Sequence, residues 1–378
     1  MCGSKRGNDA LLVRSLIIQN QKLITVPMRK KQSPFIITLT TLFVLLLSIF
    51  TVEGAKKTYG VVGSSNGNVK LFVFGDSYVD TGNFIHSQSY KPPCGITFPG
   101  HPGGRFCDGR VLTDYLALYL KIDSPIPNAY RNASNIQNGI NFAYGGTGVF
   151  DTHIDGPNLT AQINTFEQLI QQNLYTKTDL QSSFVLVNAG GNDYTAHIQH
   201  GSFFDIPKFT KSLVEQLARD IKRIQSLGVG KVAVSLIQPM GCLPELTVID
   251  MHMNCIDLVN KVSQNHNQLL NDAIKQFNTQ AGKTVLVTLD LYNAFLSAID
   301  TMNKAHDRNS SLMNPLEECC VANMGHECGD VDEKGAKQYK VCQNPNLAFF
   351  WDTVHPSQNG WNAIFTLLQP SIAQFTLL

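Results

Sequence analysis

The sequence has few charged residues and no excess of either sign. Charged side chains make up 16% of its 378 residues, and 30 basic residues face 29 acidic ones. A chain so balanced has no extended field that would attract polyanions, so nucleic-acid binding is not predicted. Low-complexity linkers and internal repeats are also lacking, whereas 43% of the residues are hydrophobic, enough for a large core. A globular protein is predicted.

The longest apolar run is near the N-terminus, from Phe35 to Phe50. Three basic residues, 29–31, precede it and small residues follow it at Gly54, which is the pattern of a secretory signal peptide. The run is shorter than the roughly 20 residues that span a bilayer, so export is predicted and an uncleaved anchor is the alternative. Met28 is the predicted start. Because an exported protein can be glycosylated, the three sequons are predicted to carry glycans. They are at Asn132, Asn158 and Asn309.

Eight of the nine cysteines lie beyond the predicted leader, and an even number in an exported protein favours disulfides. Cys242 and Cys255 are expected to close one loop. Four more cysteines gather near His326 and could be drawn as a zinc site, but they lack paired C-x-x-C spacing, so disulfides are favoured there too. These four are Cys319, Cys320, Cys328 and Cys342.

Short β-branched runs alternate with helical patterns, which predicts a three-layer α/β/α sandwich with a mostly parallel sheet. The runs expected as strands are Lys70 to Phe74, Phe184 to Asn188, Lys231 to Ile237 and Thr284 to Leu289. The expected helices are Leu112 to Lys121, Ala161 to Gln172, Phe209 to Leu227, Cys255 to Thr279 and Ser357 to Phe375, the last capped by Ser357. The predicted organisation is a leader over residues 1–54, a short linker over 55–69 and a single domain over 70–378.

A serine stands directly after the first of these strands. The segment from Leu71 to Asn83 is an apolar strand that breaks at Gly75 and presents Ser77 just beyond its end, where a hydroxyl is exposed to react. The tripeptide of residues 75–77 is also ordinary turn material, so the serine alone is a weak signal. Its support must come from elsewhere in the chain.

A candidate base lies near the C-terminus, in the segment from Trp351 to Pro356. Asp352 precedes His355 by three residues, and the following proline disfavours helical backbone at the histidine, so both side chains can share one loop. A serine hydroxyl needs a base to take its proton, and the imidazole needs an acceptor that fixes its tautomer. The alternative is that both residues only cap the next helix.

Two further segments offer donors for a developing oxyanion, the third requirement of acyl transfer. One is the glycine-rich stretch from Asn141 to Gly148, and the other is Gly190 to Asp193, where the Asn192 amide follows a predicted strand. Each alone is an ordinary turn. Together with the serine, the acid and the histidine they predict an ester-cleaving site at the carboxyl edge of the sheet.

These segments resemble the plant branch of the GDSL-type esterases and lipases, in the SGNH hydrolase superfamily. Five blocks stand in the family's order, and the resemblance extends from Leu71 to the C-terminus. The blocks are Phe74 to Asn83, Gly104 to Arg110, Asn141 to Gly148, Gly190 to Asp193 and Asp352 to Pro356.

The resemblance implies a flavodoxin-like sheet and a secreted serine esterase or lipase that works through an acyl-enzyme. Ser77 would be the nucleophile, His355 the base and Asp352 its orienting acid. The oxyanion hole would combine the Ser77 N–H, the Gly145 N–H and the Asn192 side chain, with Gly146 as the alternative glycine. No cofactor or metal is needed. The substrate would be a small-molecule, lipid or polysaccharide ester, acyl transfer to an alcohol and a catalytically silent binding protein being the alternatives.

Two positions depart from the usual pattern of the family, since both Cys94 and Cys107 replace other residues there. We expect these two cysteines to form a disulfide beside the rim of the active site. The oligomeric state has no signal in the sequence.

Overall fold

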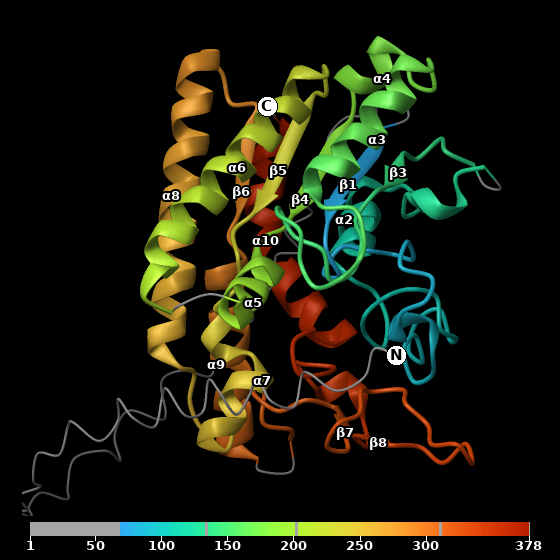
Figure 1. The fold of residues 1–378 in the computed structure, drawn as a ribbon, viewed down its shortest axis with the longest axis vertical. Helices are drawn as coiled ribbons and strands as arrows, with labels where there is room; N and C mark the ends of the chain where they lie inside the picture. Colours follow the sequence, from blue (N-terminus) through green and yellow to red (C-terminus); the bar gives the residue numbers. More distant parts are fainter. Residues whose placement is uncertain (1–68, 133–134, 201–202, 310–311, 378) are drawn as a thin grey trace, which may run out of the picture. The chain divides into compact units, whose positions relative to one another are not determined.

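The computed structural model describes residues 69–132, 135–200, 203–309 and 312–377 (Figure 1). The predicted leader over 1–54, the start at Met28 and nearly all of the linker over 55–69 lie outside these residues and stay predictions. Within the described part, the chain builds around one six-stranded sheet.

The six-stranded sheet is parallel, with neighbours in the order β2-β3-β1-β4-β5-β6. β1 and β4 stand in the middle, and every residue of both strands is buried, because helices cover the two faces of the sheet and apolar side chains must point both ways. The strand bounds are β1 Leu71–Gly75, β2 Ile126–Pro127, β3 Ile140–Asn141, β4 Phe184–Asn188, β5 Lys231–Ser235 and β6 Leu286–Leu289.

Helices form a layer on each face of this sheet (Figure 1). On one face α3 packs against β1 and α6, and α6 packs against α8; on the other face α10 packs against α2 and α9. The bounds of these helices are α2 Leu112–Leu120, α3 Leu159–Gln171, α6 Ile206–Ser226, α8 Asp257–Ala281, α9 Leu291–Arg308 and α10 Gln358–Leu377. The predicted three-layer α/β/α sandwich with a parallel sheet is therefore confirmed.

Shorter elements surround these layers. β7 (Cys320–Ala322) and β8 (Tyr339–Val341) pair antiparallel in a separate two-stranded sheet. The short α-helices are α4 Lys177–Gln181, α5 Gly191–His200 and α7 Pro244–Thr247. The 3-10 turns are η1 Gln88–Tyr90, η2 Asn128–Tyr130, η3 Phe203–Asp205, η4 Met240–Cys242, η5 Val248–Asp250 and η6 Pro345–Leu347.

The predicted elements are present, with ends that shift by a few residues. The strand Phe184–Asn188 has the predicted bounds, whereas β5 ends two residues before the predicted end, at Ser235. Ser357 caps α10 as predicted, because its Oγ accepts a hydrogen bond from the Gly360 N–H at 3.0 Å. The sequence pattern does not predict β2 and β3, whose two residues each are too short to show a pattern, nor does it predict α9.

Among the eight cysteines that the structure describes, six are joined in three disulfides. Cys242–Cys255 is confirmed, and the cysteines near His326 form disulfides as predicted, in the pairs Cys319–Cys342 and Cys320–Cys328. The predicted bond between Cys94 and Cys107 is wrong, because both are buried free thiols. The Cys107 Sγ instead accepts a hydrogen bond from the Gly109 N–H at 3.2 Å, within its own turn. No helix in the described ranges is long and apolar enough to cross a membrane.

Candidate active site

The polar segments singled out in the sequence meet at the carboxyl edge of the parallel sheet. β1 ends at Gly75, two residues before Ser77, and its neighbour β4 ends at Asn188, four residues before Asn192. The segment that contains Gly145 follows β3, on the other side of β1. Parallel strands bring their carboxyl ends to one edge, which explains why residues so far apart in sequence converge there.

Ser77, His355 and Asp352 form a continuous hydrogen-bonded row. The Ser77 Oγ lies 2.8 Å from the His355 Nε2, and the His355 Nδ1 lies 2.8 Å from the Asp352 Oδ2. Burial alone would raise the pKa of Asp352, but the charge of His355 and hydrogen bonds from its ring and backbone hold that pKa below its ordinary value. The carboxyl group is therefore ionised at neutral pH and can orient the imidazole.

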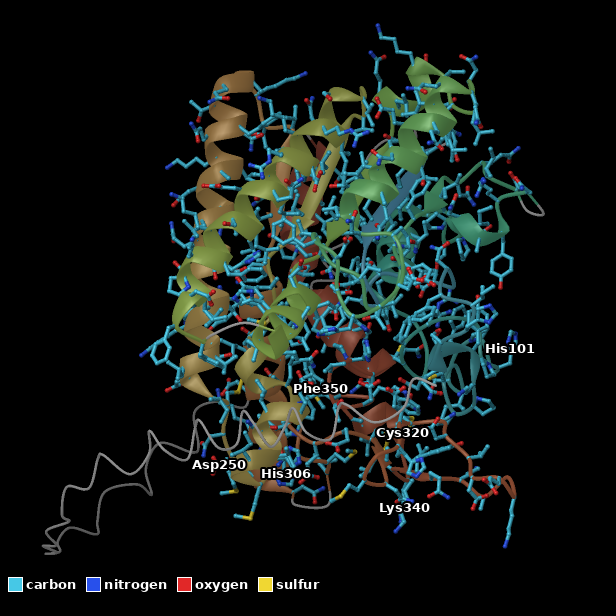
Figure 2. The ribbon with its side chains drawn as sticks, in the orientation of Figure 1. His101, Asp250, His306, Cys320, Lys340 and Phe350 are labelled. Atoms are coloured by element: carbon cyan, nitrogen blue, oxygen red, sulfur yellow. A yellow bond between two sulfur atoms is a disulfide. The ribbon has the colours of Figure 1, made fainter. Side chains whose placement is uncertain are left out.

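The loop of Asp352 and His355 is closed by its own backbone. The Trp351 N–H donates to the His355 carbonyl at 2.8 Å, and the Asp352 Oδ1 accepts the Val354 and His355 N–H groups at 3.0 and 2.8 Å. The Cys320 N–H donates to the Trp351 carbonyl at 2.7 Å, which ties the loop to β7. Figure 2 shows Phe350, the fully buried residue before this loop, in the interior of the molecule.

The turn that carries Ser77 depends on Gly75. Its φ is +136°, and a Cβ built there would lie 1.8 Å from the Asn188 carbonyl oxygen, so neither the conformation nor the space admits a side chain. The Gln162 side chain spans this glycine, since it accepts the Gly75 N–H at 2.8 Å and donates to the Gly75 carbonyl at 2.9 Å. Gln162 belongs to α3 and was not singled out in the sequence.

Asp76, the residue before the serine, is buried beneath the turn. Its Oδ1 accepts the Tyr78 N–H at 3.1 Å and the Asn188 side-chain amide at 2.9 Å. Burial raises the pKa of Asp76 from 3.8 to about 7, although both hydrogen bonds act in the opposite direction. Asp76 thus links the ends of β1 and β4 below the nucleophile position.

Gly145 lies at the site, but its N–H already has a partner. It donates to the Asp80 Oδ2 at 3.0 Å, while the Asp80 Oδ1 accepts the Gly82 and Asn83 N–H groups at 2.7 Å each. Burial raises the pKa of Asp80 to about 6, against these hydrogen bonds. The neighbouring Gly146 has a φ of +80°, and a Cβ there would contact Ile154. The sequence pattern indicates Gly145 as a donor, but it does not indicate the hydrogen bond from Gly145 to Asp80.

Asn192 stands in the first turn of α5, and its Nδ2 donates to the Thr147 carbonyl at 3.0 Å. The next residue, Asp193, accepts the Val149 and Phe150 N–H groups at 3.0 and 2.8 Å. Burial raises the pKa of Asp193 to about 6. These bonds connect the start of α5 to the glycine-rich segment, so the two predicted sources of oxyanion donors are adjacent.

The three predicted glycosylation sequons differ in their surroundings. Asn132 and Asn309 are exposed. Asn158 caps α3, because its Oδ1 accepts the Ala161 N–H at 2.9 Å, and its Nδ2 donates to Asp151 at 2.7 Å. Glycans at these positions stay a prediction.

The described part of the chain also has hollows away from Ser77 and His355. Two hollows of about 570 and 380 Å³ lie along α8, and neither is lined by Ser77, Asp352 or His355. Within the described ranges, no group of His, Cys, Asp and Glu side chains is arranged to hold a metal ion.

The sequence and the fold are similar to those of known proteins. Residues 71–368 match the family of GDSL-like lipases and acylhydrolases. The chain is 43% identical over 329 residues to GDSL esterase/lipase At5g03610 of Arabidopsis thaliana, over 83% of this chain and 91% of the relative. It is 42% identical over 346 residues to GDSL esterase/lipase At3g09930 of the same plant, over 87% of this chain and 96% of the relative. A solved structure of the acetylxylan esterase Axe2 from Geobacillus stearothermophilus is similar at 14% identity and a TM-score of 0.38, over 83% of this chain and 95% of the other.

Proposed function

Because this chain belongs to the GDSL-like lipase and acylhydrolase family and is a carboxylic ester hydrolase, we propose that Ser77 is its nucleophile, His355 its general base and Asp352 the acid that orients His355. One observation carries the proposal: the Ser77 Oγ, the imidazole and the Asp352 carboxylate form a single row with both gaps at 2.8 Å. Hydrogen-bond contact between nucleophile, base and orienting acid is the geometry that this chemistry requires.

In the proposed reaction, His355 takes the Ser77 proton as Oγ attacks the ester carbonyl carbon. The resulting tetrahedral intermediate collapses when the imidazolium gives that proton to the leaving alcohol, which leaves the acyl group on Ser77. Water then attacks the acyl carbon and gives a proton to His355. The imidazolium returns this proton to the Ser77 Oγ as the bond between Oγ and the acyl carbon breaks and the acid leaves. The ionised Asp352 stabilises the imidazolium in both halves, and no step needs a cofactor.

The proposed oxyanion donors are the Ser77 N–H, the Gly145 N–H and the Asn192 side chain. Asn192 has two N–H groups, and one donates to Thr147, so the other is available to substrate. The Gly145 N–H donates to Asp80, so a substrate oxygen has to share it with that carboxylate or draw it away. Gly146 remains the alternative glycine. A well-placed donor of this kind supplies about 3 kcal/mol of transition-state stabilisation.

We also propose that the protein is secreted, since three disulfides fit an oxidising compartment. The substrate is a carboxylic ester, and water is the acyl acceptor. Acyl transfer to an alcohol would use the same three residues, so it is separated from hydrolysis by experiment.

The test combines covalent labelling with kinetics. A fluorophosphonate should add to Ser77 in the folded protein, and Ser77→Ala and Asp352→Asn should lower kcat on 4-nitrophenyl acetate by about 10⁴-fold or more. Ser182→Ala, at an exposed serine in α4's C-terminal turn, is the matched control and should leave the rate unchanged. A label on another serine, or an active Ser77→Ala variant, would overturn the proposal. Adding alcohols to the assay separates hydrolysis from transfer by the ratio of acylated alcohol to free acid.

A further inference from the structure

Phe106 is an apolar side chain that contacts the proposed base directly. Its ring stacks on the His355 imidazole, with centroids 5.4 Å apart and planes 29° apart. The ring also lies against Gly145, because a Cβ built on that glycine would come within 2.2 Å of the Phe106 Cζ. Phe106 therefore fills the space between the base and one proposed oxyanion glycine.

The chain on both sides of Phe106 is held in place. The Arg105 guanidinium donates to the two oxygens of the buried Asp114 at 2.8 and 2.7 Å. On the other side Cys107 is fully buried, and its Sγ accepts the Gly109 N–H at 3.2 Å. A half-buried ring between two anchored neighbours keeps a fixed position beside the imidazole.

Within the part of the chain that the structure describes, Tyr78 is the other aromatic ring next to the imidazole, at a centroid distance of 6.0 Å. It is buried, and its hydroxyl donates to the Val354 carbonyl at 2.8 Å, so it supports the loop of His355 from within. Phe106 is the more exposed of the two rings, and it is the one that a substrate can reach.

The geometry of the proposed reaction shows which part of the ester lies near Phe106. The proposed base returns its proton to the leaving alcohol, so the alcohol oxygen must come within hydrogen-bond distance of the His355 Nε2. The group attached to that oxygen then passes along whatever borders the imidazole, which is the Phe106 ring. We propose that Phe106 is a specificity-determining residue that binds the alcohol portion of the ester and favours apolar or aromatic alcohols over hydrophilic ones. This inference rests on the proposed function.

The inference is tested by the ratio of kcat/KM between two esters, because a loss of activity that affects both esters equally cancels in this ratio. In the wild type, benzyl acetate should have a higher kcat/KM than 2-hydroxyethyl acetate. Phe106→Leu and Phe106→Ala should lower this ratio by about three- to tenfold, the range expected for loss of an aromatic contact, whereas Phe106→Tyr should retain it. The ratio between methyl butanoate and methyl acetate, which differ in the acyl part, should stay within about twofold in every variant.

The matched control is Phe98→Leu, in the same loop, where the ring lies against the Arg105 and Arg110 guanidinium groups and not against the His355 ring. It should leave both ratios unchanged. A measurement on the wild type alone guards against variants that fail to fold: benzyl alcohol should inhibit competitively at lower concentration than 1,2-ethanediol.

An unchanged alcohol ratio in folded Phe106→Leu, a change in the acyl ratio alone, or equal inhibition by the two alcohols would each overturn the inference while ester hydrolysis stands. A folded wild-type protein that cleaves none of these esters would overturn the proposed function, and the inference with it.

Discussion

The Tyr78 hydroxyl donates a hydrogen bond of 2.8 Å to the Val354 carbonyl, across 276 residues of sequence. Tyr78 follows the proposed nucleophile and Val354 precedes the proposed base, so one hydrogen bond joins the two backbone segments that must stay in register. The Tyr78 ring is also packed against Trp361 of α10, at a centroid distance of 5.1 Å. The contact between Ser77 and His355 therefore depends on buried structure behind it.

Tyr78→Phe removes this hydrogen bond and leaves the ring in place. The Val354 carbonyl then loses a buried partner, so the free energy of unfolding should fall by about 1–3 kcal/mol, and kcat should fall while KM changes little. Urea unfolding and ester kinetics measure the two effects. Tyr119→Phe, on α2, is the control, since its hydroxyl makes no hydrogen bond to any residue that the structure describes. Equal stability of Tyr78→Phe and the wild type would contradict the prediction.

Asn192→Ala should lower kcat by roughly 10²- to 10³-fold with a small effect on KM, because an oxyanion donor acts mainly in the transition state. Asn362→Ala, an exposed residue of α10, should leave both constants unchanged. Steady-state kinetics on a single activated ester is sufficient. A loss confined to KM would assign Asn192 to ground-state binding instead.

Stability should fall as pH rises from about 4 to 7, because the contributions of Asp76, Asp80 and Asp193 together exceed the opposite contribution of the buried His266, whose pKa burial lowers from 6.5 to about 3. Burial raises the pKa values of the three aspartates from 3.8 to about 7, 6 and 6. Between the unfolded and folded pKa values the folded protein binds more protons than the unfolded chain, so raising the pH favours unfolding.

Asp76→Asn isolates one of these contributions. The substitution removes a carboxyl group whose titration can change the free energy of unfolding by as much as about 1.4 kcal/mol per pH unit. In urea unfolding between pH 4 and 7, the free energy of unfolding of the variant should therefore fall less steeply than that of the wild type. Asp151→Asn, at an exposed position, should keep the wild-type slope. A wild-type slope in Asp76→Asn would contradict the prediction.

Gly75→Ala should lower the free energy of unfolding by about 3 kcal/mol or more, because the methyl group meets the Asn188 carbonyl in addition to an unfavourable φ. Gly228→Ala is the matched comparison. Its φ is +94° and nothing lies within 4 Å of the added Cβ, so it should cost only about 1–2 kcal/mol. Thermal or urea unfolding of both variants gives the difference, and similar losses would contradict the steric argument.

Cys94 and Cys107 should react with iodoacetamide only after the protein unfolds. Burial raises the pKa of the Cys94 thiol to about 12 and that of Cys107 well above its ordinary value, so little thiolate is available in the folded state. Peptide mapping without reductant should find alkylation at these two cysteines in urea and none in buffer. The six cysteines in disulfides are the internal control.

The parts of the protein that depend on local pattern can be predicted from its sequence. Buried strands such as Phe184–Asn188 appear as uninterrupted apolar runs, and their alternation with helices predicts a parallel sheet. Asp352 and His355 are three residues apart before a proline, so their contact is formed within one loop and could be foreseen. The position of Ser77 beyond a strand that ends at a glycine is equally local.

The contacts between segments that are distant in sequence cannot be predicted in this way, because they depend on how the elements pack. The bond from Gly145 to Asp80, the free thiols of Cys94 and Cys107 and the ring of Phe106 on His355 join segments whose distance is set by the packing of the sheet and its helices. Strands of two residues, such as β3, likewise exist because a neighbouring strand supplies their hydrogen bonds. Local preferences along the chain fix which elements form, whereas the close packing of the interior fixes which side chains meet.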